Sequence, residues 1–250
     1  MNMNVQAKFD CAISFRNQEV KYVNIGLIQF AYRMMGPVGY CEIDQRPVIL
    51  FIHGWPLNGL TYEHIINCLS KEFICIAVDL AGLGNTNWND QVDLSPKGQA
   101  MLLSQFMKTL NIKAYAIYGN DSGGMIGRYL AEMDRDRITH LMLSNTEVPN
   151  ERPPWLPFYK LCMRLPGFPF VMRQFLAIKT FVRSPMAFGG VFNDKVHLEG
   201  VFDGDFVQPL LISNTAYSNS MASFMQVFNW QQLDELTSVH PNLSMPTLFI

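Results

Sequence analysis

The segment Gly119-Asn120-Asp121-Ser122-Gly123 places an acidic residue between two glycines, directly after the apolar run Ala114–Tyr118. Small flanking residues allow a buried strand to turn sharply into a helix, and such a turn forces its central residue into a strained backbone conformation. The central side chain then projects from the carboxyl edge of the sheet, where open α/β sheets bind ligands. The helix N-terminus adds partial positive charge beside it. We therefore predict that Asp121 is a nucleophile and that Gly119 and Gly123 form its turn.

Two other interpretations of this segment stay open at this point. The letters Asp-Ser-Gly-Gly make Ser122 a second candidate nucleophile, as in an esterase or lipase-type serine hydrolase, although Asn120 stands where that pattern needs a glycine. The remaining interpretation is a tight turn that Asp121 caps without any chemistry. The strand before the turn and a second motif favour Asp121 as the nucleophile.

The second motif is His53-Gly54-Trp55-Pro56, which follows the apolar run Val48–Ile52. A hydrolase of this layout holds a developing oxyanion between two backbone N–H groups, one from this loop and one from the residue after the nucleophile. Here these donors would belong to Trp55 and Ser122. We expect His53, Gly54 and Pro56 to shape the loop, with His53 as a structural hydrogen-bonding residue rather than a catalytic base.

Apolar runs alternate with helical patterns from Val20 onward, which indicates a parallel sheet with right-handed crossovers. A hairpin is predicted at 21–33, with its turn at Asn24–Gly26. The sequence predicts further strands at 47–52, 73–78, 114–118 and 140–143, and helices at 62–69, from Ser95-Pro96 onward and at about 125–133. In the helix that Ser95 caps, one apolar stripe is expected to contain Met101, Leu102, Phe106 and Leu110.

Three regions follow from changes in composition along the chain. Residues 1–149 form the α/β core, residues 150–244 are rich in proline and short helical patterns and form a helical cap, and residues 245–250 begin a further core strand. Within the cap, Leu161–Val182 is apolar but contains Arg164, Arg173, Lys179 and two prolines, which excludes a membrane span. We interpret this stretch as amphipathic helices that flank a surface groove.

Composition narrows the classes of function. Of 250 residues, 16% are charged and 49% are hydrophobic, and the net charge is −2. This balance argues against disorder and against nucleic-acid binding, which would need a basic surplus. Five cysteines without a Cys-x-x-Cys pair predict reduced core thiols, and no signal peptide is apparent, so we expect a cytoplasmic protein. No metal-ligand cluster is evident, and the oligomeric state is undetermined.

The two motifs, together with Asp79-Leu-Ala-Gly-Leu-Gly-Asn-Thr86, resemble the α/β-hydrolase superfamily, in the branch of haloalkane dehalogenases and epoxide hydrolases. The resemblance implies an α/β-hydrolase fold, a mostly parallel sheet with helices on both faces. It also implies that Asp121 attacks a carbon bearing halide or epoxide oxygen in a small apolar molecule, and that water then hydrolyses the ester. No cofactor is implied. Glu147 matches one family position of the acid that orients the catalytic histidine, with a surface loop carboxylate as the alternative, and Asp79 is expected to brace the adjacent loop.

The sequence departs from both branches at the leaving-group site. Dehalogenases carry Asn and Trp where this chain has Trp55 and Ser122, and the Trp55 indole is a substitute donor. Epoxide hydrolases protonate the epoxide oxygen with two cap tyrosines, and Gln231 stands where one is expected. The candidate pocket residues in the cap are Tyr159, Tyr217 and Trp230.

The catalytic histidine of the family follows the last core strand. The five histidines of this chain are His53, His64, His140, His197 and His240, and none follows the final predicted strand. The resemblance therefore predicts a C-terminally truncated chain that lacks the final strand and helix and stalls as the alkyl-enzyme. A catalytically incomplete fragment or pseudoenzyme that acts as a binding module is the alternative.

Overall fold

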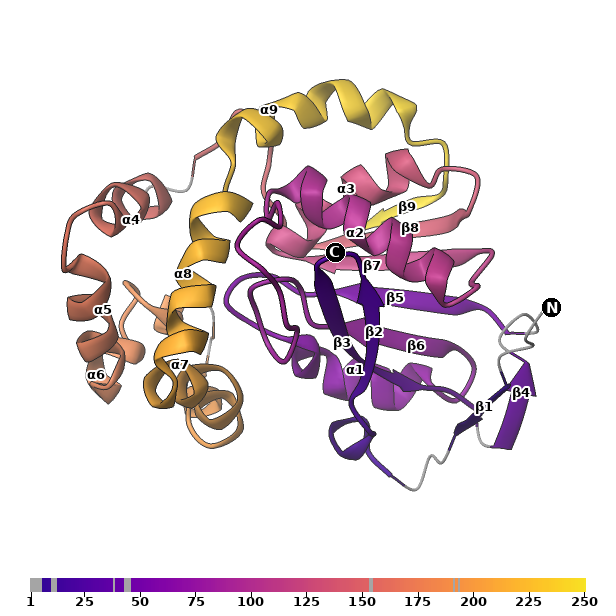
Figure 1. Ribbon diagram of the computed structural model, residues 1–250, viewed down its shortest axis with the longest axis horizontal. Coiled ribbons are helices and arrows are strands. Elements are labelled where there is room, and N and C mark those ends of the chain that lie inside the picture. Colours follow the sequence, from indigo (N-terminus) through magenta and orange to yellow (C-terminus); the bar gives the residue numbers. More distant parts are fainter. Residues whose placement is uncertain are drawn as a thin grey trace.

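The computed structural model describes residues 6–9, 13–37, 39–42, 46–152, 155–190, 192 and 194–250. Its main sheet has seven strands in the order β2-β3-β6-β5-β7-β8-β9 (Figure 1). These strands are β2 (Lys21–Ile25), β3 (Ile28–Met35), β5 (Val48–Ile52), β6 (Ile74–Val78), β7 (Tyr115–Asn120), β8 (Ile138–Ser144) and β9 (Thr247–Phe249). A separate antiparallel pair joins β1 (Gln6–Phe9) to β4 (Gly39–Glu42).

Helices cover both faces of the sheet because its central strands are apolar on both sides. In β5, Leu50 and Ile52 belong to the core shared with α2 (Pro96–Thr109) and α3 (Ser122–Met133). The alternate residue Phe51 faces the other way and packs in the core with α1 (Glu63–Leu69). Strands β5 to β9 pair in parallel, whereas the predicted hairpin of β2 and β3 adds its strands antiparallel. The predicted α/β class is confirmed.

Helix α2 begins as predicted but is rotated from its expected stripe. The Ser95 hydroxyl accepts a hydrogen bond from the Gly98 N–H, and Pro96 occupies the first turn. Met101 is exposed, so its placement on the apolar stripe was wrong; the buried apolar side chains are Ala100, Leu103, Phe106 and Met107. Their spacing of three and four residues describes a stripe centred on Leu103.

Between β8 and β9 the chain is helical in its described part, and we call residues 155–242 the helical segment. It contains α4 (Trp155–Met163), α5 (Phe168–Leu176), α6 (Lys179–Val182), α7 (Gln208–Ile212), α8 (Asn214–Val227) and α9 (Trp230–Val239). Figure 1 shows α4 to α8 to one side of the sheet, while α9 runs back towards β9.

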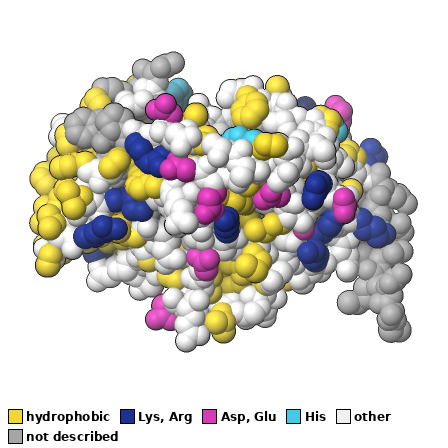
Figure 2. All heavy atoms as spheres, turned by 90° about the horizontal axis from the view of Figure 1, so that it is seen from above, with side chains coloured by type: hydrophobic (Ala, Val, Ile, Leu, Met, Phe, Trp, Pro, Cys, Tyr) yellow, Lys and Arg dark blue, Asp and Glu magenta, His cyan; other side chains and the backbone are white. Residues whose placement is uncertain are grey.

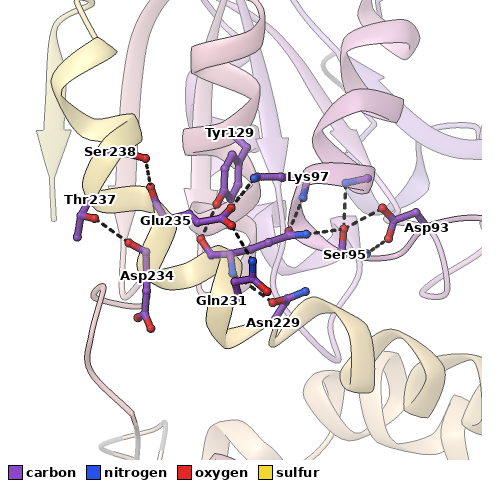
Figure 3. Close-up of polar contacts among 12 residues, drawn as sticks. Asp93, Ser95, Lys97, Tyr129, Asn229, Gln231, Asp234, Glu235, Thr237 and Ser238 are labelled. Atoms are coloured by element: carbon purple, nitrogen blue, oxygen red, sulfur yellow. Dashed lines mark hydrogen bonds and ion pairs between the residues drawn. The ribbon is translucent and has the colours of Figure 1, made fainter.

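Polar contacts attach α9 to the core (Figure 3). Lys97 pairs with Glu235, and the Tyr129 hydroxyl donates to the carbonyl oxygen of Gln232. The Gln232 side chain accepts from the Lys97 N–H at 3.0 Å and donates to the Ser95 hydroxyl at 3.2 Å. Helix α9 therefore makes polar contacts with both the start of α2 and the middle of α3.

The cysteines agree only partly with the expected core thiols. Cys75 and Cys162 are buried and free, but Cys68 is exposed, so its assignment to the core was wrong. Cys11 and the side chain of Cys41 lie outside the described residues. No described helix combines the length and the apolar character needed to cross a membrane.

Candidate active site

The turn between β7 and α3 has the geometry of a nucleophile elbow. Asp121 adopts φ 54° and ψ −136°, and α3 begins at the next residue, Ser122, rather than near Met125 as predicted. A Cβ atom on Gly123 would lie 2.1 Å from the Ile52 carbonyl oxygen, and one on Gly119 would lie 2.7 Å from the Gly123 carbonyl oxygen. Only glycine fits at these two positions, and their close contacts hold Asp121 in a backbone conformation that side chains rarely adopt.

Two loops converge on this elbow from the carboxyl ends of the neighbouring parallel strands β5 and β8. After β5, Gly54 packs so closely that a Cβ there would lie 2.4 Å from the Asp121 Cβ. After β8, a Cβ on Gly124 would lie 2.4 Å from the Thr146 hydroxyl oxygen. The Asp121 N–H donates to the Ser144 carbonyl oxygen at 3.2 Å. The structure thus brings together the Asp121 motif, the His53 motif and the Glu147 loop.

The two N–H groups expected to hold an oxyanion lie beside Asp121, and each already has an acceptor. The Ser122 N–H donates to the Asp121 carboxylate, and the Trp55 N–H donates to the Ser122 hydroxyl oxygen at 3.0 Å. The indole N–H of Trp55 donates to the Ser220 carbonyl oxygen at 2.8 Å. This contact takes the indole out of the leaving-group role that the sequence suggested for it.

Ser122 is fully buried, and no histidine hydrogen-bonds to it. A serine nucleophile is activated by an adjacent base. The hydroxyl of Ser122 instead orients the Trp55 amide, so the geometry favours Asp121 over Ser122 as the nucleophile.

Asp121 and Glu147 form a pair of carboxylates whose negative charges repel one another. Burial raises the pKa of Asp121 to about 6, against a lowering contribution from the Ser122 N–H. Burial together with the charge on Asp121 raises the pKa of Glu147 to about 7. The Thr146 hydroxyl donates to the Glu147 carboxylate at 3.2 Å. Two carboxyl groups in one poorly hydrated site disfavour double ionisation, which is typical of functional sites.

Arg128 holds the loop that carries Glu147, a role that was not predicted from the sequence. Its side chain is buried in α3, and it donates to the Gly124 carbonyl oxygen at 3.1 Å and to the Glu147 carbonyl oxygen at 2.8 Å. It also donates to the Thr146 hydroxyl at 3.0 Å and lies 3.3 Å from His240 Nε2. Burial lowers the pKa of Arg128 to about 10. The available signal was a single arginine within the otherwise uncharged first turns of α3.

His53 has the geometry of a structural residue. Its Nε2 accepts the Leu80 N–H at 3.0 Å, and its Nδ1 lies 2.9 Å from the Gly54 carbonyl oxygen. Complete burial lowers the pKa of His53, so the ring is neutral and both nitrogens are in use. The neighbouring carboxylate of Asp79 accepts the N–H groups of Gly59 and Asn85 at 2.8 and 2.9 Å, which fixes the loop after β6.

The remaining histidines do not supply a base at the elbow. All five lie in the described part of the chain, and none hydrogen-bonds to Asp121 or Glu147. His240 contacts Arg128, and burial followed by the Arg128 charge lowers its pKa. Among the described residues, no group of three or more His, Cys, Asp and Glu side chains is placed to hold a metal ion.

An apolar cavity of about 190 Å³ lies between the Trp55 loop and the helical segment. The loop contributes Trp55 and Pro56, and the helical segment contributes Leu156, Tyr159, Met163, Met172, Leu176, Phe181, Met186, Ala187, Phe188, Leu210, Met221 and Phe224. Asp121 is not among the lining residues; Trp55 connects the two, since it lines the cavity and follows Gly54, which touches Asp121. The linear, flexible methionines suit a pocket for apolar molecules of varied shape.

The structure separates the three aromatic pocket candidates. Tyr159 lines the cavity, and its hydroxyl donates to the Met186 carbonyl oxygen. Tyr217 is buried, and its hydroxyl donates to the Pro169 carbonyl oxygen at 2.6 Å, away from the cavity lining. Trp230 lies under the cations of Arg152 and Lys160, at 5.0 and 5.5 Å from its ring centre. Neither Tyr217 nor Trp230 is among the residues that line this cavity, and both rings pack against other partners.

Comparison with known sequences agrees with this geometry. A family model described as "alpha/beta hydrolase fold" matches residues 47–183. An uncharacterized hydrolase of Saccharomyces cerevisiae, YNR064C, is 31% identical over 114 residues, 46% of this chain and 37% of that protein. Haloalkane dehalogenase 2 of Mycobacterium tuberculosis is 30% identical over 111 residues, 44% of this chain. These matches span only 37% and 39% of the relatives' own lengths.

Comparison with solved structures extends over more of the chain. The haloalkane dehalogenase DatA from Agrobacterium tumefaciens C58 superposes with a TM-score of 0.72 at 17% identity, covering 92% of this chain and 78% of that one. The epoxide hydrolase CorEH superposes with a TM-score of 0.69 at 16% identity, covering 92% and 81%. At these identities the likeness shows a shared fold.

Proposed function

The chain belongs to the alpha/beta hydrolase fold family, and we propose that it acts as a hydrolase in which Asp121 is the nucleophile. The observation that carries the proposal is Asp121 itself, an acidic residue held at φ 54° on the turn from β7 to α3. A carboxylate in this position needs no partner to ionise it, because it is already the nucleophilic form above its pKa. The whole-protein activity proposed is cleavage of a carbon–halogen or epoxide bond in a small apolar molecule.

The first step follows from the arrangement around Asp121. One carboxylate oxygen attacks the substrate carbon and an ester bond forms. The electron pair of the broken bond goes to the halide, which departs, or to the epoxide oxygen, which stays on the neighbouring carbon and takes a proton from water. The Trp55 N–H is the proposed donor from the β5 loop, and it exchanges its contact with the Ser122 hydroxyl for one with the atom that takes up the negative charge. The backbone donors and the helix N-terminus stabilise the charge that develops there.

Water completes the cycle by adding to the ester carbonyl carbon, which releases an alcohol or diol and restores Asp121. This step consumes one water molecule and requires a base to take its proton. Since no histidine side chain hydrogen-bonds to Asp121 or Glu147, we assign only ester formation to the residues described above. Glu147 is the proposed acid of the site, and Arg128 is a positioning residue that holds the loop on which Glu147 lies.

The substrate class rests on the cavity beside Trp55. Its lining is apolar except for the Tyr159 hydroxyl, which is already hydrogen-bonded, and its volume of about 190 Å³ accommodates a molecule of several carbon atoms. Relatives named haloalkane dehalogenase and epoxide hydrolase support this choice of substrate class. We propose that residues 150–244 form the cap over this cavity.

Intact mass spectrometry tests the proposal directly. The protein is incubated with terminal haloalkanes and epoxides of increasing length, and both covalent adducts and released alcohol or diol are measured. We expect a substrate adduct or product with the unmodified protein and neither with Asp121→Asn, because asparagine keeps the backbone conformation but cannot form the ester. Ser122→Ala is the matched control and is expected to keep the reaction.

The same assay separates the alternatives. Adducts that persist in Asp121→Asn but vanish in Ser122→Ala would assign the chemistry to Ser122. A folded protein that gives neither adduct nor product with any compound of the panel would contradict the proposed function. The rate of ester formation is expected to fall as the pH drops through about 6, where Asp121 becomes protonated.

A further inference from the structure

Helices α4 and α5, together with the residues just after each helix, expose an unusual number of large hydrophobic side chains. Seven of them, which we call the outer apolar face, are Phe158, Leu161, Leu165, Phe170, Val171, Phe175 and Ile178. Helix α5 has no buried residue, and Phe170 is 67% exposed. The described residues of 13–147 form a far longer stretch but expose only five large hydrophobic side chains. A concentration of this kind marks an interaction site rather than ordinary surface.

The same stretch of chain carries positive charge without acidic residues. Between positions 155 and 190 there is no Asp or Glu, and the basic residues are Lys160, Arg164, Arg173, Lys179 and Arg183. Arg173 donates to backbone carbonyl oxygens of α7 rather than to a carboxylate. Arg164 is exposed between Leu161 and Leu165, with no ion pair in the described part of the chain.

Acidic groups from the rest of the helical segment reach only one end of this face. Glu199 pairs with Arg183 at 3.0 Å, and Glu199 and Asp203 line a groove together with Lys179. The unbalanced positive charge is therefore centred on Arg164 and Arg173. Figure 2 shows hydrophobic side chains gathered at the end of the molecule where Figure 1 places α4 to α6, with Lys and Arg side chains beside them.

The inner sides of these two helices line the apolar cavity. Leu156, Tyr159 and Met163 reach it from α4, and Met172 and Leu176 reach it from α5. One helix layer, about 10 Å thick, thus separates the outer apolar face from the cavity. A molecule dissolved in a surface that covered this face would need to cross only that layer.

We propose that the outer apolar face docks on an anionic lipid surface. Exposed aromatic and aliphatic side chains would enter the boundary between headgroups and acyl chains, and Arg164 would lie against the anionic headgroups, as in interfacial amphipathic helices. The positive charge of this face favours an anionic lipid surface over a second copy of the chain. A second copy of the chain, docked through the same face by twofold symmetry, would bring the basic residues of both copies together.

Vesicle co-sedimentation of the full chain tests this proposal. The probes are vesicles of phosphatidylcholine alone and of phosphatidylcholine mixed in equal parts with phosphatidylserine. We expect binding to the mixed vesicles and much less to the neutral ones. Phe170→Ser should weaken binding roughly tenfold through lost apolar burial, and Arg164→Gln about fivefold through one lost charge near the surface.

Matched controls lie on the core surface. Met101→Ser and Lys71→Gln replace an exposed apolar and an exposed basic residue, and both should bind as the unmodified protein does. Circular dichroism melting checks that every variant is folded. Equal binding to both vesicle types, no binding to either, or equal losses in the control variants would overturn the proposal. So would size-exclusion chromatography showing a dimer that Phe170→Ser dissociates.

This inference does not rest on the proposed function. Vesicle binding needs no turnover, so Asp121→Asn is expected to bind the mixed vesicles as the unmodified protein does. A protein that binds vesicles but forms no ester would therefore support the lipid-docking proposal and contradict the proposed function. A protein that forms the ester but binds no vesicles would support the proposed function and contradict lipid docking.

Discussion

The carboxyl edge of the sheet and the outer helices α4 to α6 differ most in how tightly they are packed. At the edge, a Cβ atom on Gly123 would lie 2.1 Å from a carbonyl oxygen. In the outer helices, a Cβ atom on Gly167 would find no atom within 4 Å, and α5 has no buried residue. Both regions border the cavity, yet only the carboxyl edge of the sheet is held rigid by its neighbours.

This difference indicates how the molecule divides its tasks. A strained residue such as Asp121 persists only where the surrounding contacts determine its conformation, and the two loops that converge on it provide those contacts. The outer helices bury little surface, so they contribute little to the free energy of folding and can adapt to what they contact. Four experiments, taken from the largest expected effect to the smallest, test that division.

The largest effect is expected for Gly123→Ala. The new methyl group would overlap the Ile52 carbonyl oxygen in β5, so either the elbow or the strand must move, at a cost of roughly 5 kcal/mol or more. Gly167→Ala is the matched change in the outer region, where only the positive φ of 81° opposes a side chain, at about 1 kcal/mol. Urea unfolding measures both. Equal losses would show that the two regions are packed alike.

A second comparison uses two phenylalanines of the helical segment. Phe224 in α8 is buried against Trp55, with ring centres 4.7 Å apart, so Phe224→Ala should cost roughly 4 kcal/mol. Phe170 in α5 is exposed, so Phe170→Ala should change the free energy of unfolding by less than about 0.5 kcal/mol. A large loss from Phe170→Ala in the absence of lipid would mean that α5 is packed in solution.

The third prediction concerns pH and belongs to the edge alone. The folded protein raises the pKa of Asp121 to about 6 and of Glu147 to about 7, so it binds more protons than the unfolded chain between roughly pH 4 and pH 7. Stability therefore falls as the pH rises through this window and is flat above it.

Thermal unfolding across this pH range measures the effect. Glu147→Gln removes one of the titrating groups and should flatten the upper part of the slope. Glu235→Gln on α9 serves as the control, because that carboxylate is paired with Lys97 at the surface. A stability that rises with pH through this window would contradict the assignment of two protonated carboxyl groups to the folded state.

The smallest effect is expected for the ion pair of Lys97 and Glu235, which fastens α9 to α2. Both side chains are partly exposed, so a double-mutant cycle with Lys97→Met and Glu235→Gln should give a coupling energy of about 0.5 kcal/mol. The buried contacts of Leu233 and Leu236 then account for most of the attachment of α9. A coupling above about 2 kcal/mol would make the polar contacts of Figure 3 the main fastening.

The tightly packed region is also the one that the sequence described well. The strands at Val48–Ile52 and Ile74–Val78 were predicted because continuous apolar runs report burial on both faces, and the elbow was predicted from five adjacent residues. These signals are local, so no distant contact is needed to read them. The early start of α3 at Ser122 was missed because two glycines weaken helix propensity. The packing of β5 against Gly123 and of Thr146 against Gly124 compensates for this.

Contacts between distant residues explain the other misses. Arg128 meets His240, which lies 112 residues away, and Tyr217 gives its hydroxyl to the carbonyl of Pro169, 48 residues away. Neither partner is implied by the residue types alone. The sequence pattern in the helical segment also left the position of each aromatic ring undetermined, because amphipathic helices of similar composition can pack in several ways.

Trp55 contacts both the helical segment and the loop beside Asp121, so its fluorescence reports on how these two regions move relative to one another. Its indole donates to a carbonyl oxygen of α8 while its backbone adjoins the Asp121 turn. Any movement that lifts α8 from the sheet removes that hydrogen bond and exposes the ring to water, and indole emission shifts to longer wavelength in water. The chain has four tryptophans, so the emission that is lost in Trp55→Phe gives the signal of this ring, which reports whether α8 stays in contact with the loop beside Asp121.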